Sequence, residues 1–253
     1  MKLYLKIRNE AKLLFLTLAA IISVAVVDVK DSSRVCKEVH ISIINPEFSN
    51  FVAEDEVRAL VTGDQAVPVV GSPYYRIELK EIEKRAESNI YIQEAQAFKD
   101  HKGNLLVDIY IAKPIARIIR QGKKDLYISD QGNLIETTAR YTTRVVLISG
   151  AFADNLSGNL KKDHPHRKLF EFLVHINQDP FWSAQISQLD IDSDGDIILY
   201  PQVTRQFVQF GKVDEWEAKL FKLRVFYDKI LPFKGWNTYT KVNLEYDNQI
   251  ICE

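Results

Sequence analysis

The sequence predicts an α+β protein, and three observations carry this prediction. One uncharged, strongly apolar run lies near the N-terminus. Behind it, stretches with helical spacing of apolar residues are interspersed with stretches in which every second residue is apolar. The 253 residues are 46% hydrophobic and 26% charged, with a formal net charge of −1, which is enough for a sizeable globular core. This near-neutral charge gives no electrostatic reason to expect a nucleic-acid partner.

The N-terminus predicts a membrane anchor. Residues 1–12 carry four basic side chains against one acid, and residues 13–27 carry no charge. With its flanking residues the run predicts a transmembrane helix over 13–29, followed by a body on the far side of the membrane. Because the basic flank comes first, residues 1–12 are expected in the cytoplasm. The alternative is a signal peptide cleaved after Ser23-Val24-Ala25, and the uncharged run is close to signal-peptide length. We favour the anchor, because flanking residues extend the run, and both interpretations export the body.

Residues 36–113 predict a first module made of one strand, two helices and two strands. "KEVHISII" alternates like a strand. "VAEDEVRALVTG" predicts a helix with an acidic first turn that ends at Gly63. "IELKEIEKRAESN" predicts a second helix with Ile82 and Ala86 on one face. "YIQEAQAFKDHKGNLLVDIYIAKPIARII" predicts a hairpin that turns at residues 100–104.

Residues 114–253 predict a larger, strand-rich domain. "ARIIRQGKKDLYISDQGNLIE" predicts two or three short strands, and "TRVVLISG" predicts a buried one. "PHRKLFEFLVHIN" predicts a helix with Pro165 at its first position. "AQISQLDIDSDGDIILYP" predicts another hairpin, and "TRQFVQFG" another strand.

The last 40 residues predict a long helix and a closing strand. "DEWEAKLFKLRVFYDKILP" predicts the helix, with Asp214 and Glu217 as a capping box and Pro232 as its stop. "TKVNLEYDNQIIC" alternates like one continuous strand, in which Val242 and Leu244 are expected to face the core.

"LDIDSDGDIILY" resembles the opening of an EF-hand calcium loop, because it spaces Asp190, Asp192 and Asp194 two residues apart. The twelfth position, which should supply a bidentate carboxylate, is Pro201 and cannot bind calcium. Asp194-Gly195 is a strong hairpin-turn dipeptide, and "KDHKGNLLV" and "SDQGNLIE" use similar turn chemistry. We therefore predict a hairpin, with an isolated calcium-binding turn as the alternative.

Sites for metals or catalysis are not evident. "DHPHRK" brings together Asp163, His164 and His166, with His175 as the only nearby further ligand, and it fits a helix start better than a zinc site. The chain has no G-x-S-x-G elbow and no glycine-rich phosphate loop. We expect no catalytic residue, no cofactor, no bound metal and no small-molecule substrate.

The chain has two cysteines, Cys36 and Cys252, and neither has a histidine beside it in the sequence. In an oxidising compartment they could pair, although one pair near opposite ends of the exported part is not a disulfide framework. Two unpaired thiols remain the alternative.

The order of these segments resembles the FtsQ/DivIB family of bacterial cell-division proteins, in the form found in Bacteroidetes-type bacteria. "SNIYIQEAQAFKDHKGNLLVDIYIAKPIARII" resembles the end of a POTRA module, where Lys113-Pro114-Ile115-Ala116 leads into a β domain. "LYISDQGNLI" resembles the D-x-x-G hairpin that opens that domain. "FVQFGKVDEWEAKLFKLRVFYDKILPFKGWNTYTKVNLEYDNQIIC" resembles the family's last strand–helix–strand block, so the resemblance covers nearly the whole chain.

The resemblance implies a non-catalytic scaffold of septal cell division. Such a protein spans the bacterial inner membrane once, keeps its bulk in the periplasm and links membrane and periplasmic division proteins. Its implied partners are FtsB and FtsL, together with other septal proteins, and FtsB and FtsL would bind by strand addition along the C-terminal strand. Four residues fall by position on this partner-binding segment: Leu244, Tyr246, Asn248 and Gln249.

Two other readings of the sequence are open. A secreted, calcium-stabilised binding protein or hydrolase would lose residues 1–25 and melt at a calcium-dependent temperature. The POTRA protein of an outer-membrane barrel would need many amphipathic strands after the first module, whereas two long helical patterns follow residue 160.

Overall fold

The structure is a computed structural model that describes residues 16–18, 34–63, 68–161 and 165–253. It divides into two compact units, one reaching to Ile111 and one running from Ala112 to Glu253. In the described part of the chain, no helix is long and apolar enough to cross a membrane. Residues 16–18 are helical, and the rest of the predicted membrane segment lies outside the described residues.

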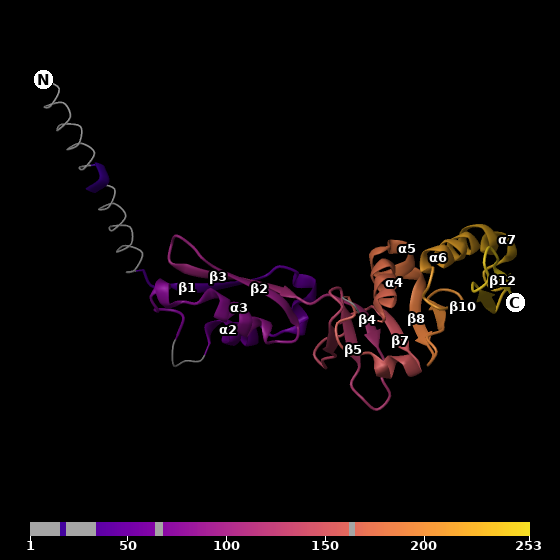
Figure 1. Cartoon of the computed structure of the whole chain (residues 1–253), viewed down its shortest axis with the longest axis horizontal. Helices are drawn as coiled ribbons and strands as arrows, with labels where there is room; N and C mark the ends of the chain where they lie inside the picture. Colours follow the sequence, from indigo (N-terminus) through magenta and orange to yellow (C-terminus); the bar gives the residue numbers. More distant parts are fainter. Residues whose placement is uncertain (1–15, 19–33, 64–67, 162–164) are drawn as a thin grey trace, which may run out of the picture. The chain divides into compact units, whose positions relative to one another are not determined.

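The first unit has the predicted order of one strand, two helices and two strands. Its elements are β1 (Glu38–Ile43), η1 (Pro46–Phe51), α2 (Glu54–Thr62), η2 (Tyr74–Arg76), α3 (Leu79–Glu87), β2 (Ile92–Lys99) and β3 (Asn104–Ile111). The sheet order is β1-β3-β2, with β1 parallel and β2 antiparallel to β3. Helices α2 and α3 cover one face, where alternate residues of β3 such as Val107 and Ile109 are fully buried (Figure 1).

Strand β2 lies at an edge of this sheet, and side chains of α3 cover its outward amides. The Ala95 N–H donates to Glu87 Oε1 at 3.1 Å, and the Ala97 N–H donates to Glu83 Oε1 at 2.8 Å. Edge strands expose unpaired donors that can capture another strand. Because carboxylates on α3 accept from two of these donors, this edge is closed to strand addition at both positions.

The second unit is built on a mixed sheet, which has nine strands within the described residues. Its elements are β4 (Pro114–Ile118), β5 (Leu126–Ser129), β6 (Leu134–Glu136), β7 (Val146–Ser149), η3 (Ala151–Asn155), α4 (Arg167–Gln178), α5 (Pro180–Gln185), β8 (Ile186–Ile191), β9 (Ile197–Pro201), β10 (Phe207–Gly211), α6 (Trp216–Val225), η4 (Phe226–Ile230), α7 (Leu231–Lys234), β11 (Lys241–Asn243) and β12 (Ile251–Cys252). The strand order is β12-β11-β10-β9-β8-β7-β4-β5-β6. The α+β prediction is therefore confirmed.

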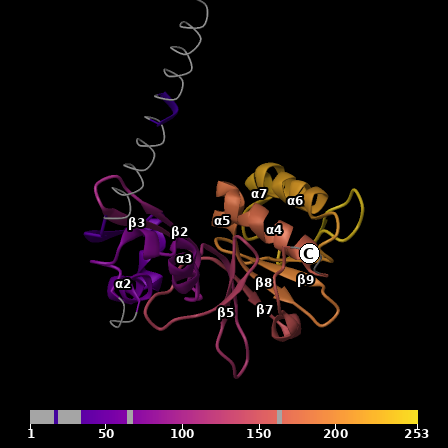
Figure 2. The ribbon, with the colours of Figure 1, turned by 60° about the vertical axis from the view of Figure 1, so that its left-hand side comes forward.

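Helices α4 to α7 lie together on one side of this sheet (Figure 2). The core forms between them, where Phe172 of α4 stacks on Phe210 of β10 with ring centroids 5.0 Å apart. Leu223 and Phe226 of the long C-terminal helical segment are also buried in this cluster. One face of that helical segment therefore packs against the core.

The ends of the two main helices differ from prediction. Helix α4 begins at Arg167 rather than at Pro165, with His166 as its N-cap. The predicted capping box before α6 does not form, because Asp214 is in an ion pair with Lys168 and the N-cap is Glu215 in a left-handed conformation. That ion pair joins residues 46 positions apart, which local sequence patterns do not reveal.

Pro232 does not stop the long C-terminal helix, contrary to prediction. The α-helix α6 passes into a π-helical turn, η4, and then into α7, which contains Pro232 and continues to Lys234. Pro232 lies in the first turn of α7, where a proline is tolerated because the N–H that it lacks needs no helical partner there. The short helix α5 was not predicted; Asp179 caps it, accepting from the amides of Phe181 at 2.8 Å and Trp182 at 3.2 Å.

The run that resembled a calcium loop is a hairpin turn between β8 and β9, as predicted. Asp192 Oδ1 accepts from the backbone amides of Asp194 and Asp196, each at 2.9 Å. Gly195 sits at the turn with φ +85°. In the first unit, Asp100 accepts three backbone amides in the same manner. The Asp192 carboxylate thus organises a turn.

We expect Asp192→Ala to destabilise the second unit at neutral pH and much less in acid. The amide of Asp196, and then those of Asp194 and Gly195, hold the pKa of Asp192 below its ordinary value. A lowered folded-state pKa stabilises the fold above the unfolded pKa of about 3.9, and the effect is lost as the pH falls through the folded-state pKa. Urea unfolding at pH 7 and at about pH 3 measures the difference.

The control for this prediction is Asp194→Ala. Among the described residues, no hydrogen bond or ion pair engages the Asp194 side chain, so this variant should match the unmutated protein at both pH values. An Asp192→Ala deficit of equal size at both pH values would contradict the role of the ionised carboxylate.

Candidate partner-binding edge

The chain ends in an open sheet edge at β12. Lys241 and Glu253 exchange backbone hydrogen bonds of 3.2 and 3.0 Å, and Val242 lies opposite Cys252. In an antiparallel pair, bonded positions alternate with positions whose N–H and C=O groups point away from the neighbour. Cys252 therefore directs both backbone groups outward from the sheet. β12 is the last strand of the described sheet, so these groups are available to an added strand.

The prediction of a single closing strand is wrong. The C-terminal segment forms a short hairpin of β11 and β12, joined by residues 244–250. Strand β11 ends at Asn243 because the Asn243 Oδ1 accepts the amide of Glu245 at 2.8 Å and turns the chain. The Glu245 carboxylate in turn accepts from Gln209 at 2.7 Å and from Asn243 at 3.1 Å. Asn248 has φ +55°, which completes the reversal.

Because of this hairpin, the four residues that the resemblance assigns to a partner-binding strand lie elsewhere. All four lie in the connection between β11 and β12, and none lies in a strand. Leu244 is fully buried, as its predicted core position requires, so its side chain is not a surface contact. Tyr246 is 54% exposed, and Asn248 and Gln249 are also exposed. The structure therefore groups three exposed side chains beside the open edge.

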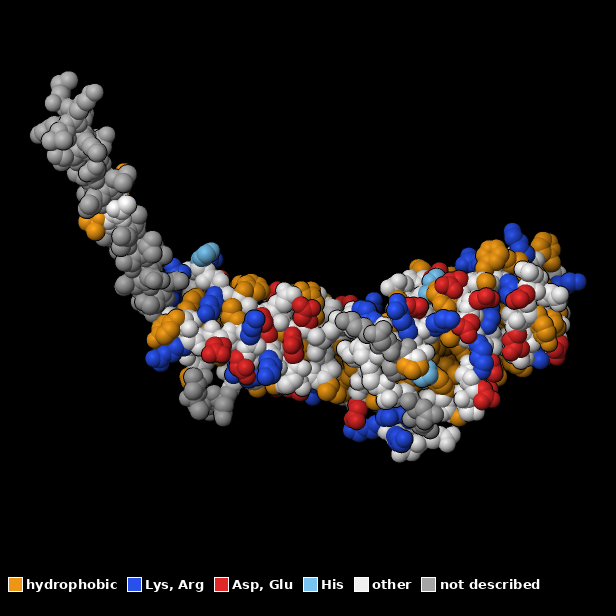
Figure 3. All heavy atoms as spheres, in the orientation of Figure 1, with side chains coloured by type: hydrophobic (Ala, Val, Ile, Leu, Met, Phe, Trp, Pro, Cys, Tyr) orange, Lys and Arg blue, Asp and Glu red, His pale blue; other side chains and the backbone are white. Residues whose placement is uncertain are grey.

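A groove of about 610 Å³ runs between α6 and this connection. Its walls include the apolar side chains of Phe221, Val225 and Ile250, and also Asn248. Phe221 is 71% exposed on α6. In the space-filling view, hydrophobic side chains lie among basic and acidic side chains over the region of α6 and α7 (Figure 3). The open edge thus has an amphipathic groove next to it.

Lys222 fixes the connection against α6. Its Nζ donates to the carbonyl oxygens of Leu244 and Tyr246, each at 2.7 Å. One turn earlier, Lys219 Nζ donates to the carbonyl of Lys212 at 2.6 Å, and burial together with the neighbouring Lys222 lowers the pKa of Lys219. Sequence reasoning missed this role of Lys222, because nothing local indicates that a helical lysine caps the carbonyls of a distant turn.

The cysteines and the predicted histidine cluster offer no reactive centre in the described structure. Cys36 and Cys252 are both free, and burial raises the pKa of each thiol. The ring of His166 packs edge-on against Phe152 at 4.5 Å, and that of His175 packs against Trp216 at 4.8 Å. Asp163 and His164 lie outside the described residues. Among the residues that are described, no three His, Cys, Asp or Glu side chains group as a metal site.

The fold and this edge define a modular protein with an open strand edge suited to binding another polypeptide. Comparison with protein families agrees with this class. Residues 34–110 match the POTRA-like domain, and residues 113–253 match the family described as "FtsQ/DivIB, C-terminal related". Because the second match covers more than half of the chain, the protein belongs to the FtsQ/DivIB C-terminal related family. No curated protein matches the chain.

Proposed function

We propose that this protein is a non-catalytic scaffold of the bacterial division machinery. Membership of the FtsQ/DivIB C-terminal related family supports a scaffold role in cell division. The observation that carries the mechanism is the outward-facing backbone of β12 beside the groove of α6. When a strand is added at such an edge, the backbone hydrogen bonds provide affinity for any extended segment. Contacts of side chains with the adjacent groove provide specificity.

The proposed partners are FtsB and FtsL, together with other septal proteins. In this proposal an extended segment of a partner pairs with β12, and its neighbouring apolar residues enter the groove beside Phe221 and Ile250. Tyr246, Asn248 and Gln249 stand at the end of the added strand and contact its side chains. By resemblance to the family, the POTRA-like unit and the membrane helix would help to recruit the protein to the septum. Two outward amides of the β2 edge are already bonded to glutamates, so we assign the binding of FtsB and FtsL to the second unit.

The proposed location is the inner membrane at the division septum. Residues 13–29 would anchor the chain, with residues 1–12 in the cytoplasm and both units in the periplasm. A fluorescent fusion to the full-length protein tests this location. We expect a band at midcell; a diffuse periplasmic or secreted signal would remove the division assignment.

Replacing Tyr246 should weaken partner binding without unfolding the protein. The ring is exposed beside β12, and an aromatic contact of this kind commonly contributes about 2 kcal/mol, or roughly thirtyfold in affinity. Co-purification of FtsB and FtsL with Tyr246→Ala measures the loss. Tyr75→Ala is the matched control, because Tyr75 is a 62% exposed tyrosine of the first unit. Equal recovery of FtsB and FtsL with both variants would contradict the assignment of the β12 edge as their binding site.

A further inference from the structure

A second binding site is indicated by a pocket of about 380 Å³ in the second unit. The parallel strands β7 and β8 pair only from Leu147 and Gln188 onward. Just before that point, β8 has an irregular register between Ile186 and Gln188. The pocket opens beside Val146 and Ile186, next to the start of this pairing. Three strands, β9 to β11, separate β8 from the open edge at β12.

The pocket combines an apolar floor with side-chain donors. Ile115, Val146, Ile176 and Ile186 are buried hydrophobic residues that line it. Pockets of this size, with an apolar lining and a few converging polar groups, are the usual form of a ligand site. No aspartate or glutamate is among the described residues that line this one, although both arginine and amide side chains are. The pocket therefore favours an anionic ligand with an apolar portion.

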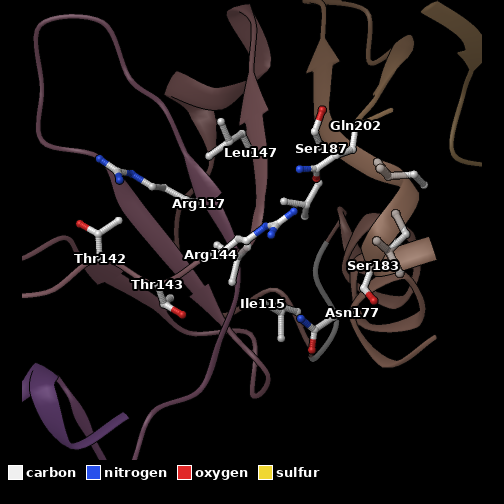
Figure 4. A pocket seen from close by; sticks show the side chains of 14 residues that line it. Ile115, Arg117, Thr142, Thr143, Arg144, Leu147, Asn177, Ser183, Ser187 and Gln202 are labelled. Atoms are coloured by element: carbon white, nitrogen blue, oxygen red, sulfur yellow. The ribbon is translucent and has the colours of Figure 1, made fainter. Parts of the chain in front are cut away.

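Only one of the two lining arginines is available to a ligand. Arg117 donates to Asp125 Oδ2 from Nε at 3.0 Å and from Nη2 at 2.7 Å, so its charge is already paired. Arg144, which is exposed, has no hydrogen bond or ion pair with any described residue. In Figure 4 the Arg117 side chain points away from Arg144, whereas Arg144 points toward Ser187 and Gln202.

The remaining donors stand around the same space. The hydroxyls of Ser187 and Ser183 already donate to the carbonyls of Tyr200 at 2.8 Å and Pro180 at 3.3 Å. The side-chain amides of Asn177 and Gln202 have no hydrogen-bond partner among the described residues. The Arg144 guanidinium with the free amide of Gln202 beside it matches the charge and the acceptor oxygens of one carboxylate.

We propose that this pocket binds a carboxylate of a peptide segment, with Arg144 as the ion-pair partner and an adjacent apolar side chain of the peptide on the isoleucine and valine floor. The inference rests on the proposed function in that the ligand belongs to a protein partner. The carboxylate could come from a Glu or Asp side chain or from a chain terminus, which have the same chemistry.

Three short peptides test the site on the full-length protein by ligand-observed NMR titration. Acetyl-Ile-Glu-Leu-amide carries a side-chain carboxylate, and acetyl-Ile-Gln-Leu-amide is its neutral match. Acetyl-Ile-Leu with a free C-terminus supplies the terminal carboxylate. We expect at least one carboxylate peptide to bind about tenfold more tightly than the glutamine peptide, and its identity shows which source is preferred. Equal binding of all three overturns the proposal.

Two variants and one control assign the effect to Arg144. Arg144→Gln should abolish the tenfold preference, whereas Arg205→Gln should keep it, because Arg205 is exposed and does not line the pocket. Arg144→Glu should instead prefer acetyl-Ile-Lys-Leu-amide. Loss of the preference in Arg205→Gln as well, or its survival in Arg144→Gln, overturns the site. None of these measurements uses a division protein, so their outcome is independent of the test of the scaffold role.

Discussion

Gly150→Ala is expected to destabilise the second unit by about 3 kcal/mol or more. Gly150 follows β7 and has φ +99°, in the region that L residues avoid. A Cβ there would lie 2.1 Å from the carbonyl oxygen of Ile191 and 2.9 Å from its backbone nitrogen. Because those atoms belong to the backbone of a central strand, β8, they cannot move aside without disturbing the sheet. Urea unfolding followed by far-UV circular dichroism measures the loss.

Gly195→Ala separates the steric effect from the backbone effect. Gly195 has a similar φ of +85°, but no atom lies within 4 Å of the position that its Cβ would take. Gly195→Ala should therefore lower the free energy of unfolding by only about 1 kcal/mol, the cost of placing an L residue in a left-handed conformation. If Gly150→Ala costs no more than Gly195→Ala, the close approach of β7 and β8 is not as tight as the structure shows.

Cys252→Pro should remove partner binding and leave the fold intact. The Cys252 N–H points away from β11, so its loss breaks no hydrogen bond within the sheet. Proline is tolerated on the outer side of an edge strand for this reason. For an added strand, however, it removes a backbone donor and places a ring at the contact. We expect recovery of FtsB and FtsL to fall by about tenfold or more.

Cys252→Ala is the matched control, because it removes the thiol but keeps the N–H group. The two variants should unfold at similar urea concentrations, and only the proline variant should lose its partners. Normal partner recovery with Cys252→Pro would show that β12 is not the strand that is extended. Loss of partners from both variants would assign the effect to the thiol and contradict strand addition.

The sequence predicts this fold well wherever local periodicity decides the structure. The βααββ order of the first unit and the hairpin at Asp192 follow from apolar spacing and turn residues, and both are present. The predictions are wrong where contacts between residues distant in sequence determine the local structure. Asp214 was predicted to cap α6, but it forms an ion pair with Lys168 instead. Strand β11 ends at Asn243, whose side chain accepts the amide of Glu245, and Gln209 of β10 donates to the Glu245 carboxylate.

The candidate sites also combine features that local sequence predicts with features that depend on residues distant in sequence. The C-terminal segment could be identified from the sequence, but not the reversal that exposes Tyr246 and turns the Cys252 backbone outward. The pocket at Arg144 could not be predicted, because it depends on where two strands begin to pair. Arg144 and Ser187 are distant in sequence, and no local pattern indicates that they line one space.

The glutamates over β2 have a consequence for amide hydrogen exchange. Backbone amides at a sheet edge normally exchange quickly with solvent, and slow exchange is taken as a sign of an interior strand. The amides of Ala95 and Ala97 face outward, yet each is bonded to a carboxylate of α3. These two amides should therefore exchange as slowly as those of β3. In an exchange map, β2 would resemble an interior strand even though it is the last strand of its sheet.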